Sequence, residues 1–268
     1  MKYHDLKAAM ERLLQAPPSF KVSHEREDAL LRLDELFGEA DSEISPVLGR
    51  FYRERMDAAL GEISAYRGKE CRFWKLYSSG FIIKSGRRTL AVDVNGGCTP
   101  APGRTRITLR TDQLRSLAGI IDEYYCTHSH EDHISATLCD ALVRRGKLVV
   151  MPSEAARRWM ISGTVAAERF RSPHCWTYLN WQGNASSGLD CTMYLFTLAN
   201  GRTVMVRGDI YHEEGFEACM DQLKEWRQPV NYVFASPYHT GGRDPIAALG
   251  AEFDCRFIPL CKSQGARP

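Results

Sequence analysis

Histidines and carboxylates are concentrated in one short segment of the chain, Thr127-His128-Ser129-His130-Glu131-Asp132-His133. Neutral imidazoles and carboxylates at this density suit a divalent metal ion such as zinc, manganese or iron. His128 and His130 are two positions apart, so their side chains point the same way if the preceding strand continues through them. Asp132 and His133 then turn inward from the following loop. The spacing favours a metal site over the alternative, a polar surface loop.

The elements around this segment are predicted from hydrophobic periodicity and turn residues. Residues 120–126 indicate a strand that ends at the motif, and residues 136–145 a helix that begins after it. The other predicted strands cover residues 73–77, 81–83, 89–94, 148–151, 193–198, 203–206 and 230–234, and the other predicted helices residues 153–161 and 216–226. Strand pairs followed by strand-helix repeats indicate a layered α/β fold with mixed sheets.

The pattern His128-x-His130-x-Asp132-His133 after a strand, preceded by a hairpin that ends in Asp93 and Gly96-Gly97, resembles the signature of the metallo-β-lactamase fold superfamily. The resemblance extends over about residues 72 to 260. It implies a four-layered αββα sandwich in which the first two histidines help to bind one metal and the Asp and third His bind a second. A later Asp bridges the two metals, and Asp209, which follows the predicted strand 203–206, matches that position.

The resemblance leaves two ligands open. The family usually supplies a His about twenty residues before the bridging Asp, but residues 180–190 contain none, and Asn184 or Asp190 are the candidates to replace it. The branch similar to competence-protein hydrolase domains carries an Asn-x-Ser-like stretch there and places the last ligand at His239. The branch similar to ascorbate-6-phosphate lactonases places it at Cys261 instead. We select His239.

Two divalent metal ions are therefore the expected cofactors, most simply zinc, with manganese or iron as alternatives. The ligands implied by the resemblance are His128, His130, Asp132, His133, Asp209 and His239. Such a pair of ions can hold a metal-bound hydroxide as nucleophile at neutral pH. Asp132 is expected to be catalytic as well, as the acceptor that orients this hydroxide. Asp93 is expected to accept a hydrogen bond from a ligand histidine and so fix its tautomer.

Three functions follow from this interpretation. The first is a metal-dependent hydrolase acting on a phosphodiester or related phosphate ester, suggested by the resemblance to nuclease-like members. The second is a lactonase or carboxylic-ester hydrolase, favoured if Cys261 rather than His239 approaches the metals. The third is a binding or scaffold protein with a degenerate metal site, motivated by the missing third-motif histidine.

Apolar residues recur at helical spacing in three stretches before residue 68, at 6–14, 30–37 and 51–63. We predict three helices there, and the change of pattern near residue 69 predicts a helical N-terminal extension (1–68) and a hydrolase domain (69–268). The extension is expected to form a homodimer or to cover the site.

Composition limits the partners. Of the 268 residues, 44% are hydrophobic, and 35 Lys and Arg balance 33 Asp and Glu to a net charge of +2. This balance gives no whole-chain support for nucleic-acid binding, although a local basic groove stays open. Nothing resembles a signal peptide, no apolar run approaches the roughly 20 residues that span a bilayer, and the nine cysteines contain no Cys-x-x-Cys pair. We expect a cytoplasmic protein with a small-molecule or nucleotide-like substrate and no membrane partner.

Overall fold

The computed structural model describes residues 2–16, 24–38, 44–76, 79–98, 107–184, 189–210, 217, 221, 229–235 and 253–256. The helices of this part of the chain are α1 (Lys2–Gln15), α2 (His24–Gly38), α3 (Ile44–Ala65), α4 (Thr111–Ile120), α5 (Ala136–Val143) and α6 (Ser153–Arg158), with a short 3-10 helix at Ala167–Arg169. The strands are β1 (Arg72–Lys75), β2 (Phe81–Ser85), β3 (Arg88–Val92), β4 (Gly97–Cys98), β5 (Ile107–Thr108), β6 (Glu123–Tyr125), β7 (Leu148–Met151), β8 (Val165–Ala166), β9 (Cys175–Asn184), β10 (Leu189–Thr197), β11 (Thr203–Val206), β12 (Tyr232–Ala235) and β13 (Phe253–Arg256).

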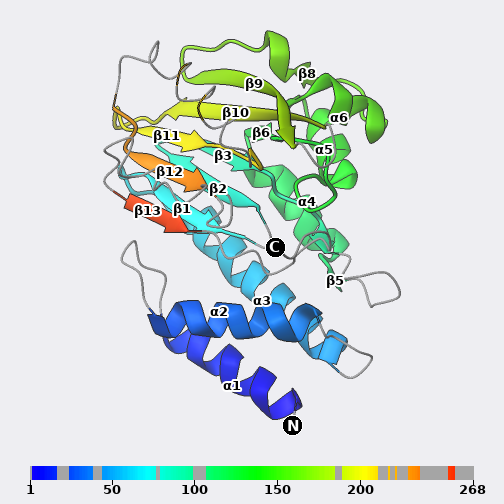
Figure 1. Cartoon of the computed structure of the whole chain (residues 1–268), viewed down its shortest axis with the longest axis vertical. Helices are drawn as coiled ribbons and strands as arrows, with labels where there is room; N and C mark the ends of the chain where they lie inside the picture. Colours follow the sequence, from blue (N-terminus) through cyan, green and yellow to red (C-terminus); the bar gives the residue numbers. More distant parts are fainter. Residues whose placement is uncertain are drawn as a thin grey trace.

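The described strands form two main sheets (Figure 1). The first has the order β1-β2-β3-β6-β7-β8, with an antiparallel meander over β1 to β3 and parallel pairing from β3 onward. The second has the order β13-β12-β11-β10-β9, antiparallel from β9 to β11 and parallel from β11 to β13. Strands β4 and β5 form a separate antiparallel pair. The mixed sheets predicted from the sequence are confirmed.

The two main sheets pack face to face through alternate residues of their strands, as period-2 side-chain alternation requires. Phe81, Val92 and Tyr125 project from the first sheet into this interface, and Phe196 and Phe234 from the second. The rings of Phe81 and Phe234 stack with their centroids 4.3 Å apart. Aromatic and aliphatic burial between the sheets therefore holds the sandwich together.

Helices cover the opposite face of the first sheet. Leu117 of α4 and Leu138 of α5 share a core with Ile82 and Tyr124, which point away from the sheet interface. Helix α5 begins where the Ser135 side chain accepts a hydrogen bond from the Leu138 amide at 3.2 Å, a normal N-cap arrangement. Three layers of the expected αββα sandwich are thus described. The predicted helix 216–226 lies almost wholly outside the described residues.

The three predicted N-terminal helices are confirmed as α1, α2 and α3. Figure 1 shows α1 and α2 side by side at one end of the molecule, with α3 running from them to the sheets. Leu6, Leu36 and Leu48 form a small core of these helices, whereas Met56 and Ile63 of α3 belong to the core behind the first sheet. Helix α3 therefore contributes to both cores. The domain division at residue 69 stays a prediction.

None of the described helices combines the length and apolarity needed to cross a bilayer.

Candidate metal site

The residues around the predicted metal site follow strands that end at the same edge of the sandwich. Asp93 comes directly after β3 and Thr127-His128 shortly after β6, and these two strands are parallel neighbours. Asp209 comes shortly after β11 in the facing sheet. Because the carboxyl ends of parallel strands meet at one edge of a sheet, residues far apart in the sequence converge there.

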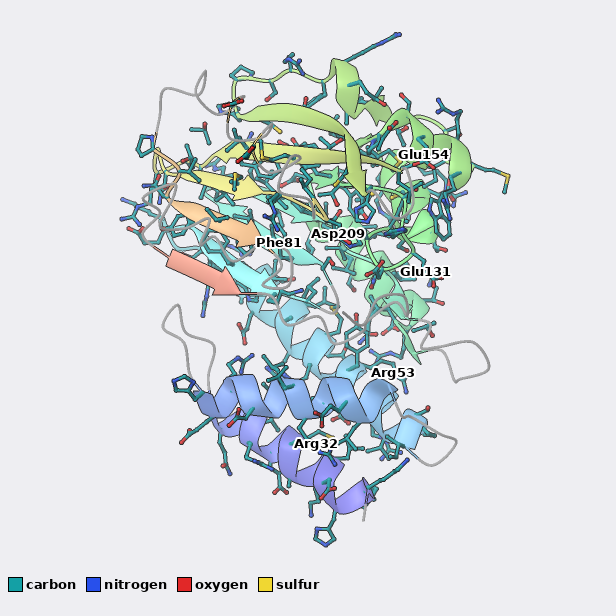
Figure 2. All side chains as sticks on the ribbon, in the orientation of Figure 1. Arg32, Arg53, Phe81, Glu131, Glu154 and Asp209 are labelled. Carbon is teal, nitrogen blue, oxygen red and sulfur yellow. The ribbon has the colours of Figure 1, made fainter. Side chains whose placement is uncertain are left out.

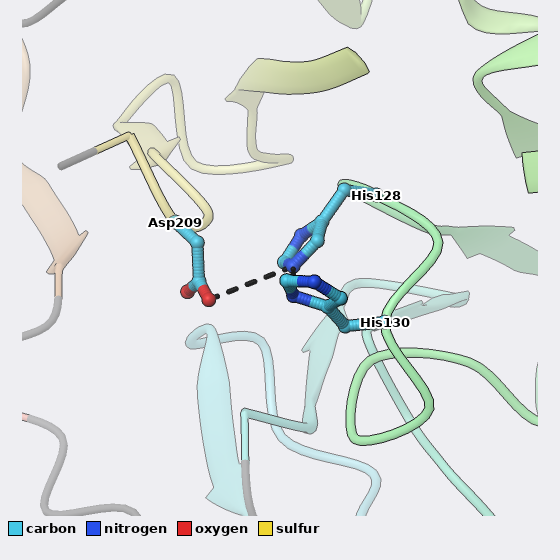
Figure 3. Close-up of side chains that lie close together, drawn as sticks. All are labelled: His128, His130 and Asp209. Carbon is cyan, nitrogen blue, oxygen red and sulfur yellow. Dashed lines mark hydrogen bonds and ion pairs between the residues drawn. The ribbon is translucent and has the colours of Figure 1, made fainter. Parts of the chain in front are cut away.

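Three imidazoles and two carboxylates meet at this edge. The Nε2 atom of His128 lies 2.8 Å from Nδ1 of His130 and 3.5 Å from Oδ2 of Asp209. The Nε2 atom of His133 lies 3.5 Å from the same Asp209 oxygen and 3.7 Å from Oδ2 of Asp132. Figure 3 shows His128, His130 and Asp209 turned toward one another. Asp209 is therefore placed between two imidazoles, the position expected of a bridging carboxylate.

Asp93 and Thr127 orient two of these imidazoles from behind. The Asp93 carboxylate accepts hydrogen bonds from the Thr127 amide at 2.7 Å and the Thr127 hydroxyl at 2.8 Å. Its Oδ2 also lies 2.9 Å from Nδ1 of His133. Because the Thr127 hydroxyl gives its proton to Asp93, its oxygen accepts from Nδ1 of His128, 3.0 Å away. Both histidines thus carry a proton on Nδ1 and present Nε2 to the group.

The backbone of the motif is tied to its surroundings at several points. The Tyr194 hydroxyl donates to the Cys126 carbonyl at 2.7 Å, and the Thr192 amide to the Thr127 carbonyl at 2.8 Å, so β10 holds the segment to the second sheet. The Trp159 indole donates to the Ser129 carbonyl at 2.9 Å from the end of α6. These bonds satisfy buried carbonyl groups and rigidify the loop.

Gly208 determines how closely Asp209 approaches the motif. Its φ of +62° lies in the left-handed region that favours glycine. A Cβ atom at this position would lie 2.8 Å from Cβ of Thr127 and 2.9 Å from Sγ of Cys191. Glycine is therefore required here both for its conformation and for the close approach of two chain segments.

Burial and neighbouring charges separate the pKa values of the histidines. Burial lowers the pKa of His128 well below its ordinary value, and burial also lowers that of His130, with Asp132 acting in the opposite direction. Burial by itself would lower the pKa of His133, but the carboxylates of Asp209, Asp132 and Asp93 raise it well above the ordinary value. Two imidazoles are therefore neutral, and the third holds a proton that a bound cation would replace.

This donor set fits a divalent metal ion. His128, His130 and Asp209 each offer one ligand atom, and these atoms lie within 4.8 Å of one another. Imidazole nitrogens together with a carboxylate suit zinc, manganese or iron. The hydrogen bonds from Nδ1 of His128 and His133 are the outer contacts that metal-binding histidines need to hold their tautomer and orientation.

The structure brings together five of the six predicted ligands: His128, His130, Asp132, His133 and Asp209. Their coordination of a metal stays a prediction. The sixth, His239, and the rival Cys261 lie outside the described residues, as does the side chain of Asn184. Glu131, which is labelled in Figure 2, is exposed.

Asp190, the other candidate for the missing third-motif ligand, has different neighbours. Burial and the charges of Glu154 and Glu168 raise its pKa. The metal-compatible group found among the described residues does not include it.

Two residues at the site had no predicted role. In the sequence, Thr127 was only the residue that precedes the first histidine of the motif. Ser79 lies in the β1–β2 turn, with its Oγ 3.1 Å from Nε2 of His133. A hydroxyl before a histidine motif was an available signal for Thr127, but no sequence pattern pointed to Ser79.

The topology and the site agree with the expected fold. Two mixed sheets pack face to face, helices cover the outer face of the first, the histidine motif follows β6, and Asp209 follows β11. The described part of the chain is consistent with the metallo-β-lactamase fold. Its nearness to the competence-protein or lactonase branch stays a prediction.

Comparisons with known proteins give similar structures at low identity. A "possible metal-dependent hydrolase" from Veillonella parvula is 13% identical, with a TM-score of 0.45 over 65% of this chain and 74% of that one. A metallo hydrolase from Ignicoccus hospitalis is 17% identical, with a TM-score of 0.43 over 62% and 70%. The diiron β-hydroxylase CmlA from Streptomyces venezuelae is 16% identical, with a TM-score of 0.43 over 70% of this chain and 41% of that one.

No protein-family model and no curated protein matches the chain. Similarity at this level does not establish an activity. The interpretation of the site therefore depends on its own residues.

Proposed function

We propose that this protein is a metal-dependent hydrolase. The observation that carries the proposal is the convergence of His128, His130 and His133 with Asp209, with the Nε2 atoms of two imidazoles 3.5 Å from one carboxylate oxygen. Both buried imidazoles are held at Nδ1, that of His128 by Thr127 and that of His133 by Asp93. A polar loop that binds no ligand would not need this arrangement. Divalent ions bound here would acidify a water molecule and polarise a substrate oxygen.

The side chains have distinct parts in this proposal. His128, His130 and His133 would hold the ions, together with Asp209 as the carboxylate shared between them. Asp132, whose Oδ2 lies 3.7 Å from Nε2 of His133, is both a ligand and the acceptor that orients the attacking water. The finer assignments belong to the same proposal: two ions, zinc as the preferred metal, and His239 as the last ligand.

We propose a phosphodiester or related phosphate ester as the substrate. Two basic side chains near the site support this choice. Lys75 ends β1 and is close enough to Asp93 for their charges to interact, although burial lowers the pKa of its ammonium group to about 7. Arg158 ends α6, is exposed, and is close enough to His130 for their charges to interact. A phosphate anion would gain from these positive charges, whereas a neutral lactone would gain less.

Hydrolysis of a bis-aryl phosphodiester, compared with hydrolysis of a sugar lactone, tests the proposal. Both substrates are offered to protein purified with its metal, before and after treatment with a chelator and after metal is returned. We expect phosphodiester hydrolysis that is lost with the chelator and restored by the metal. Metal-dependent turnover of the lactone alone would contradict the substrate class, and turnover of neither substrate would contradict the proposed phosphodiesterase.

We further propose that the N-terminal helices mediate a homodimer. Exposed apolar side chains on α1 and α2, Tyr3, Leu14 and Leu31, are available for such a contact. Sedimentation of the full chain and of a chain beginning at Ile44 measures it directly. A dimer that persists without α1 and α2 would contradict this assignment.

A further inference from the structure

The turn between β1 and β2 places a hydroxyl group beside the metal-binding atoms. Ser79 Oγ lies 3.1 Å from Nε2 of His133. The turn is closed by a hydrogen bond from the Leu76 amide to the Gly80 carbonyl at 2.8 Å, and the Lys75 ammonium donates to the same carbonyl at 3.4 Å. Ser79 is therefore held at the site by a short, bonded turn.

The hydroxyl lies on the ligand side of the imidazole ring. Asp93 engages Nδ1 of His133, whereas Ser79 approaches Nε2, the atom that also faces Asp132 and Asp209. A hydroxyl has one proton to donate and two lone pairs. When Nε2 binds a metal ion, Ser79 loses this partner, and its hydroxyl can then donate to a substrate oxygen at the same place.

Ser79, His133 and Asp93 also have the spacing of a catalytic triad, with contacts of 3.1 Å and 2.9 Å. In a triad, however, the Nε2 atom must accept the serine proton. Here the carboxylates of Asp132 and Asp209 both face Nε2, and they favour a positive charge at that atom, whether a proton or a metal ion. The surroundings therefore favour a serine that donates a hydrogen bond over a serine nucleophile.

We infer that Ser79 is a catalytic residue that donates a hydrogen bond to the substrate oxygen on which negative charge develops during hydrolysis. The inference rests on the proposed metal-dependent hydrolysis and adds a specific donor to it. No bond to Ser79 forms or breaks. Its proton stays on the hydroxyl and stabilises charge that is larger in the transition state than in the bound substrate, so its effect should be on kcat rather than on KM.

Three variants test this inference on the full chain with its metal: Ser79→Ala, Ser79→Thr and Ser116→Ala. The last removes an exposed hydroxyl of α4 that donates to the Asp112 carbonyl at 2.9 Å, and it serves as the matched control. With the bis-aryl phosphodiester, we expect Ser79→Ala to lower kcat by about 100-fold with KM nearly unchanged, since one such donor contributes about 10²–10³ in kcat. Ser79→Thr should restore most of the rate, and Ser116→Ala should behave as wild type.

Metal content and covalent labelling supply the readouts that do not depend on turnover. We expect the metal content and melting temperature of Ser79→Ala to equal those of wild type. Loss of metal in Ser79→Ala would make Ser79 a ligand and overturn the inference, as would an unchanged kcat. Chelator-resistant activity with a fluorophosphonate adduct on Ser79 would make it a nucleophile and overturn it too. Failure of wild type to turn over any substrate would reject the proposed function itself, and this inference with it.

Discussion

Replacement of Gly208 by alanine should weaken both the fold and the metal site. The φ of +62° costs an L-residue about 1–2 kcal/mol. The new methyl group would also lie 2.8 Å from Cβ of Thr127 and 2.9 Å from Sγ of Cys191. Thr127 cannot retreat without breaking its bonds to Asp93, so overpacking should add about 1–3 kcal/mol. The expected total is about 2–5 kcal/mol.

Gly146→Ala is the matched control for this substitution. Gly146 has a φ of +68°, but a Cβ atom there would meet no heavy atom within 4 Å. The free energy of unfolding of Gly146→Ala should therefore fall only by the conformational cost, about 1–2 kcal/mol. Urea unfolding gives both free energies, and metal content per chain is measured on the same samples. We expect Gly208→Ala to lose more stability than the control and to lose metal, because Asp209 is displaced. Equal losses of stability with full metal content in both variants would refute this account of the site.

Other substitutions test other contacts. Asp93→Asn should reduce metal affinity by about 10–100-fold, as measured by titration with a metal indicator, because the carboxylate that orients His133 is lost. Unchanged affinity would show that Asp93 does not support metal binding. A chain beginning at residue 69 should fail to fold, because it lacks α3, which completes the core behind the first sheet. A chain beginning at residue 44 should stay folded, and its circular dichroism spectrum should lose only the helical signal of α1 and α2. A folded chain from residue 69 would support the predicted boundary instead. Tyr194→Phe should cost about 1–3 kcal/mol in urea unfolding, because the buried Cys126 carbonyl loses its donor; no loss of stability would show that this bond does not hold the motif.

Local sequence patterns were sufficient for the elements whose apolar residues are regularly spaced. The N-terminal helices and the strands around the motif lie where periodicity predicted them, although helix α6 ends at Arg158 rather than near residue 161. Helix α4 was not predicted. Its Gln113 is buried, and the side-chain amide donates to the Arg53 carbonyl at 2.8 Å and to Asp57 at 2.7 Å. A polar residue buried by partners on another helix cannot be recognised from local periodicity.

The candidate site shows the same division. The cluster from His128 to His133 could be recognised as a metal-site candidate from residue types and spacing, whereas Asp209 and Asp93 were singled out because they match the pattern of the metallo-β-lactamase superfamily. The contact between Ser79 and His133 joins residues 54 positions apart and depends on how the first sheet orders its strands. Neither residue type nor spacing indicates that these two residues lie in contact.

Metal content per chain tests the central claim most directly. It is measured by mass spectrometry on wild type, on His130→Ala and Asp209→Ala, and on Glu131→Gln, which changes an exposed neighbour outside the group. We predict at least one bound metal ion in wild type and in Glu131→Gln, and substantial loss in the other two variants. Metal-free wild type that cannot be reconstituted, or metal retained in all variants, would contradict a metal site at His128, His130 and Asp209.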